Sequence, residues 1–230
     1  MRFDTIVFDL DGTLVDTADD LTSSLNHALK TLGRAEVPPD SVRAMVGHGA
    51  RKLLERGLAC SGAAHPELVE SGVEPFLAYY SDNIAVHSRP FDGVEAALDR
   101  LAQRGHRLAI CTNKPERLAR RLVAQLGWSE RFASLLGADS RPYRKPDPRH
   151  LLDTVAEARG TRALFVGDSR TDSDTALAAG VPIVLVSFGY STEPVDSLGA
   201  NALIDHYDQL DQAIHDIQGA FSAEGPIASA

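Results

Sequence analysis

Residues 5–17 read TIVFDLDGTLVDT and place two carboxylates directly after a short apolar run. The run from Thr5 to Leu10 is typical of a buried strand, because it is short, apolar and bounded by turn residues. Residues i and i+2 of a strand point to the same side. The spacing therefore predicts that Asp9 and Asp11 face one site, after which a Gly-Thr pair turns the chain away.

The composition describes an ordinary globular protein. The chain has 230 residues, of which 43% are hydrophobic and 24% charged, which fits one large domain or one domain with an insert. Its net charge is −9 and no basic block stands out, which disfavours nucleic acid as a partner. No apolar stretch approaches the ~20 residues of a membrane span, and two cysteines make no disulfide framework. We expect a cytoplasmic protein without a membrane partner.

Short apolar runs recur along the chain and alternate with helical patterns. A stripe of Val94, Ala97, Leu98 and Leu101, for example, has the i, i+3, i+4, i+7 spacing of an amphipathic helix. Alternating strands and helices predict an α/β fold, with a Rossmann-like parallel sheet and helices on both faces. After the first strand, the further predicted strands are 106–111, 133–136, 163–166, 182–186 and 202–204.

One stretch interrupts this alternation. Between about residue 16 and residue 89 we find three amphipathic helical faces and no convincing strand. This pattern predicts an all-helical domain over residues 17–88, inserted into a core domain formed by residues 1–16 and 89–230. The tail from about Gly219 is small and polar, and we expect it to fray.

Polar side chains follow several of the predicted strands, and in a parallel α/β sheet ligands bind at the carboxyl ends of strands. Thr112 and Asn113 follow the second strand and can donate to phosphate oxygens. Asp168 and Asp172 follow the fourth strand, and Lys145 supplies a cation just before a helix. Carboxylates at one edge repel one another, and a divalent cation with oxygen ligands is the simplest compensation.

Each of these residues taken singly has an ordinary structural interpretation. A lone Asp-x-Asp can be a solvated strand end, Thr112 a cap, Lys145 a surface charge and Asp172 an acid at a helix N-terminus. Their joint placement at successive strand ends is harder to explain in this way. Carboxylates for a metal, donors for an anion and a lysine are the parts that phosphoryl transfer needs.

In order and spacing, these motifs resemble those of the haloacid dehalogenase superfamily of phosphohydrolases over nearly the whole chain. The resemblance implies that the helical insert is a C1-type cap. It also implies a phosphatase, because dehalogenases lack the aspartate that stands here at position 11. The residues that carry the four motifs are Asp9 to Thr13, Thr112, Lys145, and Gly167-Asp168-Ser169 with Asp172.

The resemblance implies a role for each motif residue. Asp9 would attack phosphorus and Asp11 would act as acid and base. A Mg2+ ion would be held by Asp9, by the backbone carbonyl of Asp11 and by Asp168. Thr112, Asn113 and Lys145 would bind the phosphoryl group, and Lys145 is counted as catalytic. Thr13 and Asp172 would support the site.

Within the superfamily the chain is similar to phosphoglycolate phosphatases, partly through VGHGA at residues 46–50 of the insert. The familiar form of this motif has Asn where His48 stands, in a region where substrate would be contacted. Gly47 lets backbone N–H groups approach a ligand, and Arg51 could pair with a substrate carboxylate. The alternative is that the glycines only turn the chain and Arg51 is solvated.

The resemblance therefore implies Mg2+-dependent hydrolysis of a small phosphomonoester, with 2-phosphoglycolate as the first expectation. Other small phosphates, such as a sugar phosphate or pyrophosphate, are alternatives with the same mechanism. A mutase like β-phosphoglucomutase, which shares the core but retains the phosphoryl group, is a further alternative. A non-catalytic, phosphate-binding regulator is the alternative from another class. The expected partner is a small phosphorylated metabolite, and the expected assembly a monomer or a homodimer.

Overall fold

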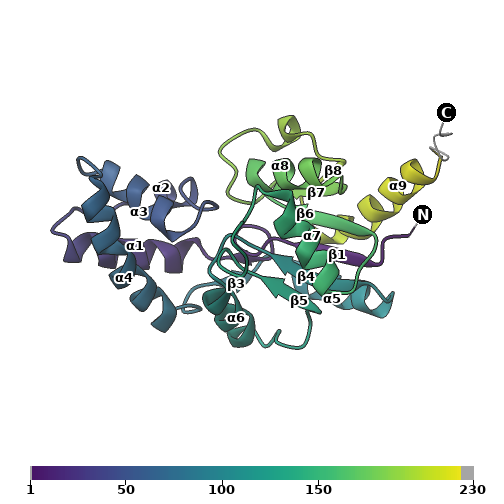
Figure 1. The fold of residues 1–230 in the computed structure, drawn as a ribbon, viewed down its shortest axis with the longest axis horizontal. Coiled ribbons are helices and arrows are strands. Elements are labelled where there is room, and N and C mark those ends of the chain that lie inside the picture. Colours follow the sequence, from purple (N-terminus) through teal and green to yellow (C-terminus); the bar gives the residue numbers. More distant parts are fainter. Residues whose placement is uncertain (1, 224–230) are drawn as a thin grey trace.

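The computed structural model describes residues 2–223, and its centre is a six-stranded sheet in the order β5-β4-β1-β6-β7-β8 (Figure 1). Every neighbouring pair of strands in this sheet is parallel. The strands are β1 (Thr5–Phe8), β4 (Arg107–Cys111), β5 (Ser134–Leu136), β6 (Ala163–Gly167), β7 (Ile183–Val186) and β8 (Ala202–Ile204). The predicted parallel α/β fold is confirmed.

Both faces of the sheet are buried under helices, which explains the continuous apolar run of its central strand. Ile6 and Phe8 of β1 belong to the hydrophobic cluster on one face, and Val7 belongs to the cluster on the other. The helices of the first face are α5 (Val94–Gln103), α6 (Glu116–Gln125) and α9 (Leu210–Ala223), and those of the second are α7 (Pro148–Glu157) and α8 (Arg170–Ala179). Two 3-10 turns, η1 (Val195–Leu198) and η2 (Tyr207–Gln209), precede β8 and α9.

The register of the central strands brings their carboxyl ends level. Phe8 of β1 pairs with Ile110 of β4 and with Val166 of β6. The residues that follow these three positions consequently meet at one edge of the sheet. This edge is where the sequence places its carboxylates and its anion donors.

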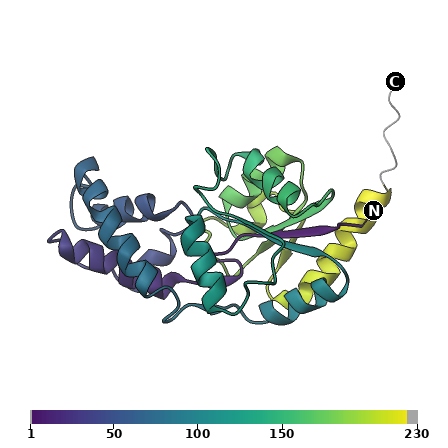
Figure 2. The same cartoon turned by 60° about the horizontal axis from the view of Figure 1, so that its bottom comes forward.

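A helical insert joins the core through a short antiparallel ribbon, β2 (Val15–Asp16) with β3 (Arg89–Pro90). The insert helices lie together to one side of the sheet (Figure 1), and the turned view in Figure 2 keeps them there. The ribbon was not predicted, because strands of two residues show no periodicity. The insert helices are α1 (Ala18–Thr31), α2 (Pro39–Arg43), α3 (Ala50–Ala59) and α4 (Pro66–Asp82).

A buried carboxylate ties the two ends of the insert together. Asp20 of α1 is 2% exposed, and its carboxylate accepts hydrogen bonds from the backbone N–H groups of His87 and Ser88. The hydroxyl of Ser88 donates to the same carboxylate at 2.6 Å. Because a buried carboxylate needs such donors, Asp20 fixes where the chain returns to the core.

The end of the chain differs in part from expectation. Helix α9 continues to Ala223, so the expectation that the chain frays from Gly219 is wrong for the first five residues of that stretch. Residues 224–230 lie outside the described part of the chain. Within residues 2–223, none of the helices combines the length and the apolar character that crossing a membrane requires.

Candidate active site

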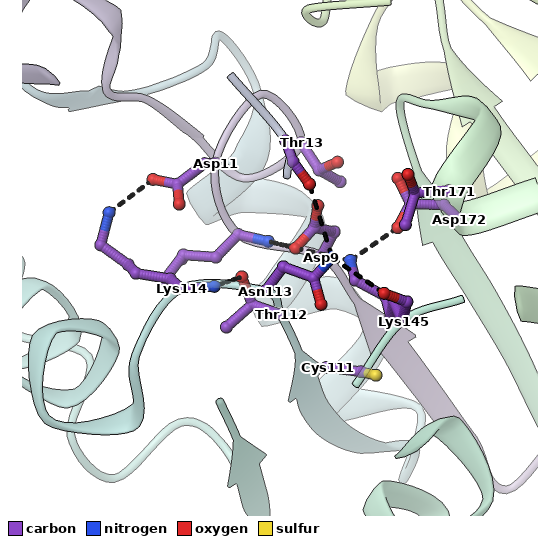
Figure 3. A network of polar contacts seen from close by, with 12 residues as sticks. Asp9, Asp11, Thr13, Cys111, Thr112, Asn113, Lys114, Lys145, Thr171 and Asp172 are labelled. Carbon is purple, nitrogen blue, oxygen red and sulfur yellow. Dashed lines mark hydrogen bonds and ion pairs between the residues drawn. The ribbon is translucent and has the colours of Figure 1, made fainter. Parts of the chain in front are cut away.

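A buried cluster of three carboxylates and one ammonium group lies at the carboxyl edge of the sheet (Figure 3). Lys145 Nζ lies 2.9 Å from Asp9 Oδ1 and 2.6 Å from Asp172 Oδ1, and the Lys145 side chain is 1% exposed. One oxygen from each of Asp9, Asp168 and Asp172 lies within 4.8 Å of the others. Three predicted strand-end positions and Lys145 are therefore brought together.

The electrostatics of this cluster are strained, because three carboxyl groups crowd around one ammonium group. Burial raises the pKa of Asp9 to about 6, with Lys145 opposing the shift and Asp172 adding to it. Burial, followed by the charges of Asp172 and Asp9, also raises the pKa of Asp168 well above its usual value. Burial lowers the pKa of Lys145, but Asp172 and Asp9 outweigh it and raise that pKa. Lys145 consequently stays charged, and one ammonium group neutralises only part of the cluster.

Asp9 enters the cluster from the end of β1. The strand ends at Phe8, so the prediction that it continues to Leu10 is wrong, and both aspartates lie beyond it. Asp9 Oδ1 accepts a hydrogen bond of 2.7 Å from the backbone N–H of Leu10. Gly12 has φ +81°, and a Cβ atom there would lie 2.6 Å from Asp168 Oδ2. Glycine is required because the backbone is left-handed and in contact with a carboxylate.

Asp168 is held on several sides. Its Oδ1 accepts from the hydroxyl of Thr13 at 3.1 Å, and its Oδ2 accepts from the backbone N–H of Tyr190 at 2.7 Å. A Cβ atom on Gly189 would lie 2.2 Å from Asp168 Cβ. Thr13, predicted as a supporting residue, donates its hydroxyl to this carboxylate.

Asp172 has both carboxylate oxygens engaged. Oδ1 accepts from Lys145, while Oδ2 accepts from the backbone N–H groups of Asp168 and Ser169 and from the Ser169 hydroxyl at 2.6 Å. Ser169 and Asp172 form a capping box at the start of α8. Asp172 therefore orients Lys145 and the Asp168 loop.

The donor set of the cluster fits a divalent cation. Hard cations such as Mg2+ prefer carboxylate and carbonyl oxygens, and Asp9 and Asp168 offer buried carboxyl oxygens within 4.8 Å of each other. Asp9 Oδ2 accepts no hydrogen bond from residues 2–223, which leaves this oxygen available to a ligand. The predicted metal set includes these two side chains.

A cavity lies between the core edge and the insert. Its core side is lined by Asp9, Asp11 and the residues Thr112 to Pro115. Its insert side is largely apolar, with side chains from α1, α3 and α4: Leu21, Leu53, Phe76, Leu77 and Tyr80.

Asp11 has a lysine partner of its own, separate from the cluster (Figure 3). Its Oδ1 lies 2.7 Å from Lys114 Nζ and accepts from the Thr17 hydroxyl at 2.7 Å. Lys114 is 5% exposed and also donates to the Tyr80 hydroxyl at 2.5 Å. The sequence analysis predicted Asp11 but gave no role to Lys114 or Tyr80. The signal for Lys114 was its place in a strand-end motif, whereas Tyr80 looked like part of an apolar helical face.

Thr112 and Asn113 follow β4 and are both buried. The Thr112 hydroxyl accepts from the backbone N–H of Lys114 at 3.2 Å. Asn113 Nδ2 donates to the backbone carbonyl of Lys145 at 3.1 Å and reaches that of Gly47 at 3.5 Å. Asn113 Oδ1 is buried, and no described residue gives it a hydrogen bond. Asn113 thus holds the Lys145 backbone and leaves one acceptor for a ligand to satisfy.

The insert loop contributes unequally to the cavity. Gly47 and Gly49 line it, with φ values of +101° and +88°. His48 lines a neighbouring cleft, where its Nδ1 lies 3.5 Å from the Thr171 hydroxyl and burial chiefly lowers its pKa. Arg51 is paired with Glu70 of α4, and its side chain is 62% exposed. The structure brings Gly47 to the predicted site but places His48 beside it and Arg51 away from it.

Tyr190 connects the cluster with the start of the insert. Its backbone N–H donates to Asp168, and its hydroxyl donates to Asp16 Oδ1 at 2.7 Å. The same hydroxyl accepts from the backbone N–H groups of Thr17 at 2.7 Å and Ala18 at 3.0 Å. The sequence analysis gave Tyr190 no role.

Comparison with known proteins agrees with this geometry. Residues 3–180 match the family model of haloacid dehalogenase-like hydrolases, and the chain belongs to this family. It is therefore an enzyme of the hydrolase class, and the family resemblance is confirmed.

Individual proteins that are similar to the chain are named phosphoglycolate phosphatase. The chain is 47% identical to the phosphoglycolate phosphatase of Mesorhizobium japonicum, over 89% of this chain and 92% of that protein. It is also 47% identical to that of Caulobacter vibrioides, over 88% and 87%. A crystal structure from Haemophilus somnus, described as a predicted phosphoglycolate phosphatase, superposes with a TM-score of 0.86 at 29% identity, over 92% and 98%.

Proposed function

We propose that the protein is a Mg2+-dependent phosphatase of small phosphomonoesters, with 2-phosphoglycolate as its substrate. The observation that carries the reaction is the buried contact of Asp9 with Lys145, beside the carboxylates of Asp168 and Asp172. The substrate is supported by relatives named phosphoglycolate phosphatase, which match most of the chain at 47% identity.

In the proposed reaction, a carboxylate oxygen of Asp9 attacks phosphorus while the bond from phosphorus to the ester oxygen breaks. Asp11 gives its proton to the departing oxygen, then takes a proton from the water that attacks the aspartyl-phosphate. This second attack releases phosphate and restores Asp9. Both carboxylates line the cavity, and Thr17 and Lys114 hold Asp11 in place.

The other site residues position these groups. Mg2+ held by Asp9, the Asp11 carbonyl and Asp168 would offset negative charge on the phosphoryl oxygens. In this proposal the phosphoryl oxygens also bind Thr112, Asn113 and Lys145. Asp172 orients Lys145, and Thr13 holds Asp168.

We also propose that residues 17–88 form a cap domain over a core of residues 1–16 and 89–230. The ribbon β2–β3 supports these boundaries, because both chain crossings lie in it. Such a cap excludes water and surrounds the leaving group. The exposed, unpaired thiol of Cys60 suits a reducing compartment, which supports a cytoplasmic enzyme. A monomer or a homodimer stays a prediction.

The cavity walls favour a small substrate over a sugar phosphate. The hydroxyl groups of a sugar need polar partners, whereas the insert side presents Leu21, Leu53, Phe76 and Leu77. A compact ester such as 2-phosphoglycolate places few polar atoms against this surface. Pyrophosphate, a mutase reaction and phosphate binding without catalysis are separated by the experiment below.

The experiment measures phosphate release from a panel of phosphorylated metabolites, with Mg2+ and with EDTA. Asp9→Asn is expected to abolish release, while the control Asp19→Asn, at an exposed position of α1, keeps it. Substantial turnover by Asp9→Asn contradicts the nucleophile assignment, and equal release in EDTA contradicts the metal requirement. Formation of a bisphosphate identifies a mutase. Release from no member of the panel identifies a binding protein.

A further inference from the structure

Lys114 is a buried cation on the wall of the cavity, and part of its hydrogen-bonding capacity is unused. Its side chain is 3% exposed, and its Nζ contacts Asp11 at 2.7 Å and the Tyr80 hydroxyl at 2.5 Å. An ammonium group has three N–H donors, and these contacts use two of them. A buried ammonium group is stable only with acceptors around it. The third N–H therefore favours a ligand with an acceptor at this point.

Tyr80, from α4, offers a second donor beside the first. It is 1% exposed, and its ring lies 4.4 Å from Lys114 Nζ. Because lysine can only donate, the Tyr80 hydroxyl accepts from it and keeps its own O–H for another partner. No residue in the described range 2–223 accepts that O–H. Burial, followed by the charge of Asp11, raises the pKa of Tyr80, so the hydroxyl stays protonated.

The surroundings make this pair the natural place for an anion. Among the described residues that line the cavity, Lys114 is the sole cation, and the insert wall around Tyr80 is apolar. Asp11 lies next to Lys114, on the side of the leaving group in the proposed reaction. A substrate with phosphorus at Asp9 and its ester oxygen at Asp11 thus directs its carbon end toward Lys114.

We propose that Lys114 and Tyr80 form a carboxylate-binding subsite, which selects small phosphomonoesters that carry an acid group beside the ester carbon. This inference rests on the proposed function and deepens it. The carboxylate accepts the third N–H of Lys114 and the O–H of Tyr80. Lys114 follows β4 of the core and Tyr80 belongs to the insert, so both parts of the chain build the subsite.

The test compares two substrates of equal length, 2-phosphoglycolate and 2-hydroxyethyl phosphate, which has a hydroxymethyl group in place of the carboxylate. Lys114→Met keeps the length of the side chain but removes its charge. Both substrates lose rate because Lys114 also contacts Asp11, so the readout is the ratio of the two kcat/KM values. We expect this ratio to fall by about tenfold to a hundredfold for Lys114→Met, and by about threefold to tenfold for Tyr80→Phe.

The matched control is Arg51→Met, which removes an exposed insert cation whose partner is Glu70. Its ratio is expected to stay within about twofold of the wild type. A larger change in Arg51→Met than in Lys114→Met overturns the subsite and makes Arg51 the carboxylate partner. Circular dichroism checks folding. If Lys114→Met does not fold, an unchanged ratio in Tyr80→Phe overturns the proposal and a lowered ratio supports it.

Failure of the subsite and failure of the proposed function give different results. If the wild type prefers 2-phosphoglycolate and Lys114→Met loses the same factor on both substrates, the subsite is wrong and the proposed function stands. If the wild type hydrolyses other phosphomonoesters but shows no preference for 2-phosphoglycolate, the substrate assignment is wrong and the subsite falls with it.

Discussion

Replacing Tyr190 with phenylalanine is expected to lower the free energy of unfolding by about 2–3 kcal/mol. The residue is 6% exposed, and its hydroxyl makes three hydrogen bonds at the start of α1. It donates to Asp16 and accepts from the backbone N–H groups of Thr17 and Ala18. No side chain of the helix itself caps this end. Tyr190 thus caps the first insert helix from the far end of the sequence.

The magnitude follows from the partners that the substitution leaves behind. Without the hydroxyl, the buried Thr17 N–H has no acceptor, and an orphaned buried donor costs about 1–3 kcal/mol. Ala18 N–H keeps only a bond of 3.3 Å to Asp16 Oδ1. Asp16 itself keeps Arg43 at 2.6 Å, so its loss is the smaller one. The ring remains, so the vacated space is only that of one oxygen atom.

Urea unfolding at neutral pH measures this change through the midpoint and the slope of the transition. The control is Tyr143→Phe, whose partly exposed hydroxyl donates to Asp153 at 2.7 Å. Asp153 keeps Arg141 at 2.9 Å, so a loss below about 1 kcal/mol is expected there. Equal losses in the two variants would refute the capping role of Tyr190.

Two further predictions concern the metal cluster and acid stability. In Gly189→Ala, a methyl group 2.2 Å from Asp168 Cβ displaces the carboxylate, so the Mg2+ concentration for half-maximal phosphate release rises at least about tenfold. Gly219→Ala, in open space, serves as its control, and an unchanged Mg2+ requirement contradicts the reasoning. The acid-stability prediction concerns Asp4. Burial alone would raise the pKa of Asp4, but hydrogen bonds from Thr161 and neighbouring groups outweigh it and lower that pKa from 3.8 to about 2. Because this pKa is lowered on folding, ionised Asp4 stabilises the fold above pH 3.8, and this stabilisation is lost as the pH falls toward 2. Asp4→Asn is therefore expected to lower the free energy of unfolding by about 1–2 kcal/mol at neutral pH. Urea titrations of Asp4→Asn and wild type at pH 7 and pH 3 check this, and an equal difference at both pH values contradicts it.

The sequence predicted the sheet well because its central strands are buried on both faces. A run such as Ile6-Val7-Phe8 has few other places in a fold, and alternation with helices requires parallel neighbours. The end of β1 was misplaced because the chain leaves the strand after Phe8, before the turn at Gly12, and periodicity does not show where a strand stops. The ribbon β2–β3 was missed because two residues in each strand carry no pattern.

The site divides in the same way. Asp9, Asp168 and Lys145 were predictable, because topology alone brings strand ends to one edge. Tyr190 was not, because its partner Asp16 lies 174 residues away and is reached only through the packing of the insert on the core. The direction of Arg51 likewise depends on the packing of α3 against α4, where Glu70 is its partner.

The two buried lysines divide the work of the site between the core and the insert. Lys145 is held by two core carboxylates, Asp9 and Asp172, so its position does not depend on the insert. Lys114 is held by Asp11 and by Tyr80, and the second of these belongs to α4. A change in the placement of α4 therefore alters the surroundings of Lys114 while leaving those of Lys145 intact. For the proposed reaction, we therefore expect substitutions in the insert to change which ester is hydrolysed without removing the attack on phosphorus, and substitutions around Lys145 to remove both.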